Sequence, residues 1–181
     1  KMSAQISIIT ITFQAEEYLQ RTLDSIHAQG SRDQFEYIII DGNSQDRTQE
    51  IIQKSTLKPD YFISENDHGI YDAMNKGLGL ATGDYVLFMN SGDEIYELET
   101  VEKIFATAPN ADIYYGETEM YDENWNSLGR RRHQAPEHFT WESFKYGMSI
   151  SHQAIYIKRS LTEPYNLQYK YSADIDWIIK I

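Results

Sequence analysis

The sequence contains no cysteine among its 181 residues. This absence excludes a disulfide framework, a thiolate metal site and a cysteine nucleophile, and it fits a reducing compartment. Long apolar runs are missing as well, because the longest, residues 37–40 and 85–89, are far too short to cross a bilayer. No positively charged and then apolar leader precedes Ser3. We therefore expect neither a signal peptide nor a membrane span.

Basic residues are scarce, with 16 lysines and arginines against 28 aspartates and glutamates and a formal net charge of −12. Residues 1–129 carry 8 basic and 23 acidic side chains, whereas residues 130–181 carry 8 and 5. An acidic surface repels phosphates, which argues against nucleic acid as a partner. If the acidic part binds a phosphorylated ligand, it requires a cation to do so.

The glycine-rich loops that cradle phosphates are also absent. After the first apolar run the chain reads TITFQAE over residues 10–16, and neither G-x-G-x-x-G nor G-K-[ST] occurs. This excludes ordinary dehydrogenases and P-loop enzymes. No G-x-S-x-G marks a hydrolase nucleophile, and the five histidines have no metal-binding spacing.

Residues 6–115 alternate apolar strands with amphipathic helices. We expect strands over residues 6–12, 35–40, 61–64, 85–89 and 112–115, and helices over 16–28, 46–54, 70–80 and 97–106. This alternation predicts right-handed β-α-β units, and hence an α/β fold with a mostly parallel, Rossmann-like sheet flanked by helices. Ligands bind such sheets at the carboxyl ends of the strands, where Thr12, Asp41 and Asp93 fall.

The pattern changes after Gly116. We expect a hairpin with strands over residues 117–121 and 128–132, a short helix over 141–146 and a strand over 150–158. A final helix from residue 172 has no C-cap signal before Ile181, so we expect it to continue beyond the given sequence. Lys1 ahead of Met2 is likewise not expected to be the natural start. Without a linker or repeat, residues 1–181 are predicted to be a single domain.

Three carboxylates could carry chemistry, and each has a plainer structural explanation. Asp41 could accept hydrogen bonds from a ribose or a base, or could turn the loop that follows it, and its position favours neither. Asp93 could bind a hard cation, although a turn around Gly92 is favoured from these residues alone. Asp174 could be a general base, although stabilising the start of a helix is favoured for it.

Several further side chains are weaker candidates. Arg130, Arg131 and Arg132 form a run of three arginines that could clamp phosphates, or could be solvated. His152 enters an apolar strand, where it is either an active-site donor or a core histidine. Asp67 precedes a predicted helix and could simply cap it.

Five segments together resemble the family 2 glycosyltransferases, which have the GT-A nucleotide-diphospho-sugar transferase fold. The segments are residues 6–14 (ISIITITFQ), 38–48 (IIIDGNSQDRT), 75–77 (NKG), 81–93 (ATGDYVLFMNSGD) and 172–174 (SAD). They cover nearly the whole chain in order. Residues 65–77, ENDHGIYDAMNKG, resemble the subgroup that assembles bacterial exopolysaccharide, capsule and colanic acid.

The resemblance implies a role for each candidate. Asp41 would hold the base of a donor nucleotide, and Asp174 would be the catalytic base. Asp93 would bind the divalent cation, Mn²⁺ or Mg²⁺, that bridges the diphosphate. The remaining nucleotide-binding residues would be Thr12, Phe13 and Asn90, and contacts to phosphate or acceptor would come from His152, Arg130, Arg132 and Asp67.

The resemblance also divides the chain by role. Residues up to about 115 would bind the donor, and a mixed part from about 116 to 181 would face the acceptor. One departure weakens the expected metal site, because Asn90 and Gly92 stand where the family usually has a further aspartate, which leaves Asp93 alone. Gln14 in place of the usual asparagine is a smaller departure.

The resulting hypothesis is an inverting glycosyltransferase of surface polysaccharide biosynthesis. It would act in the cytoplasm on a glycan or lipid-linked acceptor, with peripheral association at the inner face of the plasma membrane through that acceptor. The alternative is a catalytically silent module that binds sugar nucleotides with a degenerate metal site. A nucleotidyltransferase is disfavoured because its glycine- and lysine-rich loop is missing.

Overall fold

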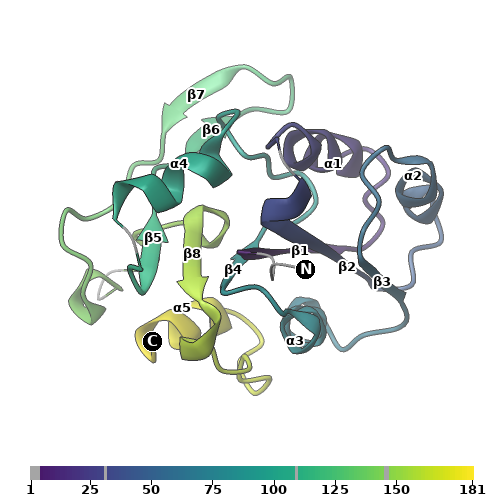
Figure 1. Ribbon diagram of the computed structural model, residues 1–181. Helices are drawn as coiled ribbons and strands as arrows, with labels where there is room; N and C mark the ends of the chain where they lie inside the picture. The colour runs from purple at the N-terminus through teal and green to yellow at the C-terminus, as the bar shows by residue number, and fades with distance from the viewer. Residues whose placement is uncertain (1–4, 31, 109, 145–146) are drawn as a thin grey trace.

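The computed structural model describes residues 5–30, 32–108, 110–144 and 147–181, and Figure 1 shows its arrangement. The strands are β1 (Ile6–Thr12), β2 (Phe35–Asp41), β3 (Tyr61–Ser64), β4 (Tyr85–Phe88), β5 (Ile113–Tyr115), β6 (Glu119–Tyr121), β7 (Ser127–Arg130) and β8 (Ile155–Lys158). The α-helices are α1 (Leu19–His27), α2 (Thr48–Lys54), α3 (Ile70–Leu80), α4 (Thr100–Thr107) and α5 (Ala173–Ile179). Short 3₁₀ helices cover Arg32–Gln34, Trp141–Phe144, His152–Ala154 and Arg159–Leu161.

One sheet of six strands, in the order β3-β2-β1-β4-β8-β5, forms the centre of the molecule. Strands β1 to β4 pair in parallel, whereas β8 runs antiparallel to both β4 and β5. The predicted α/β fold with a mostly parallel sheet is therefore confirmed. β6 and β7 pair separately as a two-stranded hairpin, as expected.

Helices cover both faces of the sheet. Figure 1 shows α1, α2 and α4 on one side, with α3 and α5 on the other. Two apolar clusters fill these two interfaces. β1 and β2 are buried along their whole length. Strands covered on both faces read as continuous apolar runs rather than alternating ones, which is why the isoleucine-rich segments form the centre of this sheet.

Several helices begin later than their sequence pattern predicts. The expected helices over 16–28, 46–54 and 97–106 begin at Leu19, Thr48 and Thr100. Asp46 illustrates the reason, since its carboxylate accepts hydrogen bonds from the backbone N–H of Thr48 at 3.0 Å and of Glu16 at 3.1 Å. Asp46 lies one residue before Arg47, the N-cap of α2, and its carboxylate binds the first helical N–H from outside the helix.

The predicted strand over 150–158 is wrong in its first half. The backbone turns through the 3₁₀ helix His152–Ala154 before β8 begins at Ile155, so His152 lies ahead of a strand rather than in it. The predicted helix over 141–146 is a 3₁₀ helix as far as Phe144, and residues 145–146 lie outside the described residues. Lys1 and Met2 lie outside them as well.

A buried carboxylate ties the amino-terminal end of the sheet together. Glu36, only 8% exposed, accepts hydrogen bonds from the Ser7 hydroxyl, from the backbone and hydroxyl groups of Thr82, and from the Gly83 N–H. These donors hold the pKa of Glu36 below its usual value in spite of its burial. The approach is close, because a Cβ on Gly83 would lie 2.6 Å from the backbone nitrogen of Ser7.

Candidate active site

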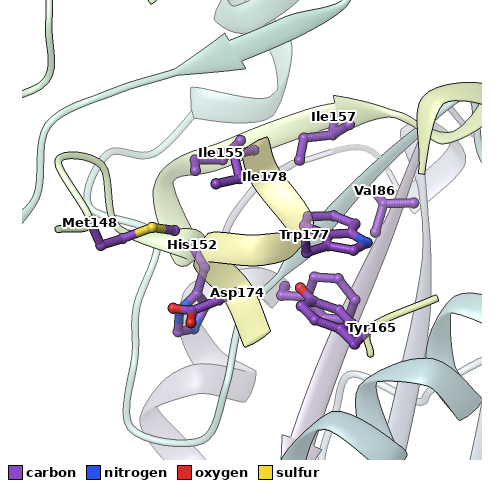
Figure 2. Close-up of a pocket in the computed structure, with 10 residues that line it drawn as sticks. Val86, Met148, His152, Ile155, Ile157, Tyr165, Asp174, Trp177 and Ile178 are labelled. Carbon is purple, nitrogen blue, oxygen red and sulfur yellow. The ribbon is translucent and has the colours of Figure 1, made fainter. Parts of the chain in front are cut away.

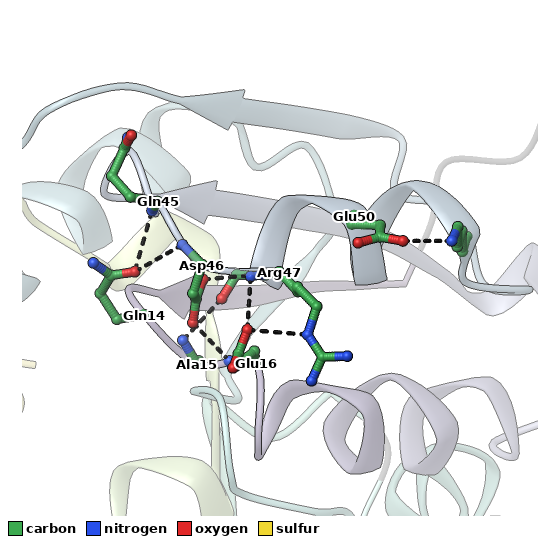
Figure 3. A network of polar contacts seen from close by, with 9 residues as sticks. Gln14, Ala15, Glu16, Gln45, Asp46, Arg47 and Glu50 are labelled. Atoms are coloured by element: carbon green, nitrogen blue, oxygen red, sulfur yellow. Dashed lines mark hydrogen bonds and ion pairs between the residues drawn. The ribbon is translucent and has the colours of Figure 1, made fainter.

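The carboxyl ends of β1 and β2 lie side by side, with Thr12 opposite Asp41 in the parallel register. A network of polar contacts joins the two loops that follow these strands (Figure 3). Gln14 Oε1 accepts hydrogen bonds from the backbone N–H groups of Gln45 and Asp46, each at 3.1 Å. Glu16 accepts one from the backbone N–H of Arg47 at 2.8 Å. The loops are thereby fixed to each other, and with them the edge of the sheet where the candidate residues gather.

Asp41 is fully buried and already satisfied by the protein. Its carboxylate accepts hydrogen bonds from the Ser44 N–H at 3.0 Å, from the Ser44 hydroxyl, and from the Ser64 hydroxyl at 2.6 Å. These contacts hold the loop after β2 and the end of β3. The loop-turning role is therefore present in the structure, and a direct bond to a nucleotide base stays a prediction.

Thr12, Phe13 and Asp67 come together around Gly42. The Phe13 ring is 63% exposed and lies so close to this glycine that an added Cβ would be 3.1 Å from the ring. The same Cβ would be 2.8 Å from Asp67 Oδ2. Thr12 Oγ1 is buried and has no hydrogen-bond partner among the described residues. The open face of Phe13, the bare backbone of Gly42 and the Asp67 carboxylate thus form a cradle, which we call the Phe13 cradle.

Asn90 contacts His152 rather than solvent. Asn90 Nδ2 lies 3.1 Å from His152 Nε2, and Asn90 Oδ1 is buried without a partner in the described part of the chain. Burial lowers the pKa of His152, the charge of Arg131 lowers it further, and only Asp174 opposes them. Burial thus favours the uncharged imidazole, and because the Asn90 amide nitrogen can only donate, this contact requires an unprotonated Nε2 on His152.

Asp174 lies at the start of α5 and lines the same small cavity as His152, as Figure 2 shows. The Tyr71 hydroxyl, from the first turn of α3, donates a hydrogen bond to Asp174 Oδ1 at 3.2 Å. Burial and the Asp174 charge both raise the pKa of Tyr71, so its hydroxyl stays protonated as a donor.

Stacked aromatic rings hold the Tyr71–Asp174 hydrogen bond in position. The Tyr71 ring stacks on Tyr165 at 5.4 Å, and Tyr165 stacks on Trp177 of α5 at 4.7 Å. Phe88 at the end of β4 packs edge-on against both of the last two rings. The stack joins α3, β4 and α5, and it therefore fixes where the Asp174 carboxylate is held.

Asp93 lies across the His152–Ala154 turn from Asp174. Its side chain is partly buried, and Gln153 Nε2 donates to Asp93 Oδ1 at 3.3 Å. Burial raises the pKa of Asp93 to about 6, which Gln153 only partly offsets. His152 and Gln153 are adjacent in the chain, and they divide the site, since the first faces Asn90 and the second faces Asp93.

The described residues contain no group of three or more His, Cys, Asp or Glu side chains that could hold a metal ion. A single carboxylate still fits Mg²⁺ or Mn²⁺ in a site completed by substrate, because such ions keep several waters and bind one or two carboxylates together with phosphate oxygens. The raised pKa of Asp93 fits this chemistry, since a nearby cation would favour the ionised form that burial disfavours.

Arg131, the middle residue of the predicted arginine run, is the arginine that reaches the site. It donates to the Ser151 hydroxyl at 2.7 Å and to the Met148 carbonyl at 3.2 Å. It lies just after β7, which ends at Arg130. Arg132 is exposed, whereas Arg130 lines a second, larger cavity beside Asp93. The predicted phosphate clamp by Arg130 and Arg132 stays a prediction.

Comparison with known proteins gives one family. A sequence model described as "Glycosyl transferase family 2" matches residues 7–165. A PGL/p-HBAD biosynthesis glycosyltransferase of Mycobacterium tuberculosis strain H37Ra is 35% identical over 183 residues, which is 96% of this chain and 68% of that protein. Within the described residues, no helix combines the length and the apolar character needed to cross a membrane.

Solved structures give the same fold. S. aureus TarS superposes with a TM-score of 0.76 at 23% identity, covering 97% of this chain but only 33% of TarS. A TarS fragment in complex with UDP-GlcNAc gives 0.52 at 28% identity, covering 60% of this chain and 33% of that one. The Pyrobaculum calidifontis mannosyltransferase PcManGT, with GDP-Man and Mn²⁺, gives 0.55 at 20% identity, covering 64% and 36%. The expected GT-A fold is thereby confirmed.

Proposed function

The chain belongs to glycosyl transferase family 2, and from this premise we propose that it is an inverting glycosyltransferase. It moves a sugar from a nucleoside-diphospho-sugar to a hydroxyl group of a glycan or lipid-linked acceptor in surface polysaccharide biosynthesis. The observation that carries the proposal is the oriented Asp174 carboxylate, which the Tyr71 hydroxyl holds at 3.2 Å and which lines a cavity with His152.

The Phe13 cradle is the proposed nucleotide site. The exposed ring of Phe13 offers a stacking surface for a base, and the bare backbone at Gly42 allows close approach. Thr12, whose buried hydroxyl has no partner among the described residues, lies beneath the proposed site at the end of β1. Asp41 supports the cradle by fixing its loop. The relatives bound to UDP-GlcNAc and GDP-Man support a nucleotide sugar as the class of donor.

Asp93 is the residue proposed to hold a divalent cation, Mn²⁺ or Mg²⁺, and Asn90, three residues earlier, has a side-chain oxygen without a partner among the described residues. When bound, such a cation neutralises charge on the departing nucleoside diphosphate. The cation would also offset the repulsion between a diphosphate and the acidic residues 1–129, which carry 23 carboxylates and 8 basic groups. The PcManGT complex with Mn²⁺ supports this choice.

The chemistry requires one base and one displacement. Asp174 accepts the proton of the acceptor hydroxyl while that oxygen forms a bond to the anomeric carbon of the donor sugar. The bond from this carbon to the diphosphate breaks, and its electron pair leaves with the nucleoside diphosphate. Because the attack comes from the face opposite the leaving group, the anomeric centre is inverted. The Tyr71 hydroxyl keeps the carboxylate aimed at the acceptor side.

We place the reaction in the cytoplasm, with the enzyme held peripherally at the inner face of the plasma membrane when its acceptor is lipid-linked. Assembly of exopolysaccharide or capsule is the proposed setting, based on residues 65–77. The second candidate function is a silent sugar-nucleotide-binding module. Asn90 and Gly92 favour it, because they stand where the family usually has a further aspartate and leave Asp93 as the one aspartate of that motif.

One experiment separates the two functions. UDP-, GDP- and dTDP-sugars are screened by thermal shift with and without Mn²⁺, and each donor that binds is then incubated alone to follow release of nucleoside diphosphate. An enzyme binds one donor in the presence of Mn²⁺ and hydrolyses it slowly, whereas a silent module binds it without turnover. Absence of binding to every donor would refute both readings of the site.

A further inference from the structure

A large cavity of about 870 Å³ opens beside Asp93 and is not used by the proposed chemistry. It is bounded by the loop after β4, by α4, by the end of β5 and by the β6–β7 hairpin. The Phe13 cradle lies at the ends of β1 and β2, whereas β5 and β8 form the other edge of the sheet. Among the described residues, none of β1 or β2 lines the cavity, whereas Asp93 and Gln153, which contact each other, both do.

Aromatic side chains line the outer part of this cavity. Tyr121 and Trp125 are 40% and 41% exposed, and their rings lie 5.4 Å apart at an angle of 40°. Tyr96, on the loop after β4, is 70% exposed. Large exposed rings gathered in one concave place mark a binding surface more often than they mark packing.

The Trp125 ring is held in position although it is exposed. The Arg21 guanidinium of α1 lies 3.9 Å from the ring centre, and Arg21 Nη1 lies 3.8 Å from Glu94 Oε1. Trp125 adopts a φ of +65°, a left-handed backbone conformation that large side chains rarely take. Asp122 maintains this turn by accepting hydrogen bonds from the backbone N–H of Asn124 at 2.9 Å and of Asn126 at 2.8 Å. The ring is thus presented in one orientation before any ligand arrives.

The charged groups in the lining select against anions. Beyond Asp93, the carboxylates are Glu94, Glu97, Glu117 and Glu119, and they come from three different elements. Arg130 is the one lysine or arginine in the described lining. Carboxylates repel phosphates and uronic acids, but they accept hydrogen bonds from sugar hydroxyls. Aromatic faces pack well against the C–H faces of a pyranose ring.

We infer that this cavity binds an uncharged glycan segment of the acceptor, with Trp125 and Tyr121 packed against its sugar rings. The inference rests on the proposed function, and it narrows the acceptor to a chain whose sugars next to the accepting hydroxyl carry no phosphate or carboxylate. The volume is sufficient for more than the accepting sugar alone, because pockets of about 300–1,000 Å³ hold ligands of drug size.

Nuclear magnetic resonance of the three tryptophan side chains tests this directly. Trp125 lies in the cavity, Trp141 is 66% exposed elsewhere, and Trp177 is buried near Asp174. The ¹⁵N-labelled protein is titrated with cellohexaose, maltohexaose and chitohexaose as neutral probes, and with hexagalacturonate as the anionic probe. The indole N–H signal of Trp125, assigned by its loss in Trp125→Phe, should shift with a neutral probe and not with hexagalacturonate. Trp141 should stay unchanged with all four.

Variants then measure the contribution of the ring. Trp125→Ala should weaken binding of the active neutral probe about tenfold or more, and Trp125→Phe, which keeps a ring, should weaken it less. Trp141→Ala is the matched control and should leave the affinity unchanged. Failure of all neutral probes to shift Trp125, a larger shift with hexagalacturonate, or equal affinity in Trp125→Ala would each overturn the inference.

A thermal-shift measurement with nucleotide sugars on the same protein preparation tests the transferase function separately from the glycan cavity. Donor binding without oligosaccharide binding would refute the glycan cavity and leave the transferase intact. Oligosaccharide binding without any donor binding would refute the transferase and leave a glycan-binding cavity.

Discussion

Replacing Asp93 by asparagine should stabilise the metal-free protein. Burial raises the pKa of this carboxyl from 3.8 to about 6, so the folded chain holds its ionised form at a cost. Asparagine has nearly the same shape, carries no charge and can still accept the hydrogen bond that Gln153 donates. The variant thus removes the electrostatic cost and leaves the packing in place.

The size and the pH dependence of this stabilisation follow from the pKa values of Asp93 in the unfolded and folded states. The difference between 3.8 and about 6 corresponds to about 3 kcal/mol of unfolding free energy. Because the folded pKa lies above the unfolded one, the cost is complete above pH 6 and shrinks as the pH falls towards 3.8. The gain of Asp93→Asn should therefore be about 3 kcal/mol at pH 7.5 and about 1 kcal/mol at pH 4.5. At pH 7.5 this corresponds to a rise in Tm of roughly 6–12 °C.

Urea unfolding in the presence of EDTA at the two pH values measures both quantities. Asp33→Asn, at an exposed aspartate, is the matched control and should change the free energy of unfolding by less than about 0.5 kcal/mol. An unchanged or lowered stability of Asp93→Asn at pH 7.5, or a gain equal at both pH values, would refute the reasoning. The stabilised variant should also lose any rise in Tm that Mn²⁺ and a nucleoside diphosphate produce in the natural chain.

Three further substitutions test the site and the fold. Asp174→Asn should lower transfer by roughly 10²- to 10⁴-fold and leave the thermal shift by donor unchanged, and full activity would exclude Asp174 as the base. Tyr71→Phe keeps the stacked ring but not the donated hydrogen bond, so kcat should fall roughly tenfold at constant donor KM, whereas a change in KM alone would assign Tyr71 to binding. Glu36→Gln should lower the free energy of unfolding by roughly 1–3 kcal/mol at pH 7. The lowered pKa of Glu36 means that its ionised form stabilises the fold above pH 4.5, and that this stabilisation is lost as the pH falls through the pKa of the folded state. Urea titrations should show a smaller difference in the free energy of unfolding between the natural chain and Glu36→Gln at pH 3.5 than at pH 7. An equal difference at both pH values would contradict this prediction.

The sheet could be predicted from the sequence because its central strands are buried on both faces. Such strands appear as unbroken apolar runs, and β1 occurs at its expected bounds while β2 extends one residue beyond them. The meeting of Thr12 and Asp41 at one edge follows from parallel pairing. The position of β8 could not be predicted in this way. Its insertion between β4 and β5, antiparallel to both, depends on contacts across the chain that no local pattern records.

The pairings inside the site depend on long separations in the chain. Asn90 and His152 are 62 residues apart, and Tyr71 and Asp174 are 103 residues apart. Residue type indicated that His152 and Asp174 could act, but nothing next to either residue indicates its partner. Arg131 belongs to the predicted arginine run, but it lies just beyond the end of β7, so no local pattern indicates which arginine of the run contacts Ser151 and Met148.

Asp93 shows why a carboxylate can be recognised in a sequence while its energetic consequence cannot. A turn around Gly92 explains the residue types equally well, and only burial separates a solvated turn from a charge held at a cost. Among the described residues, the protein offers the Asp93 carboxylate only the neutral amide of Gln153, so no cationic side chain among its hydrogen-bond partners balances its charge. A bound diphosphate would be repelled by the net negative charge of a chain with 28 acidic and 16 basic side chains. In the proposed function one divalent cation would satisfy both groups at once, so we predict that the carboxylate and the diphosphate each bind that cation more tightly when the other is present.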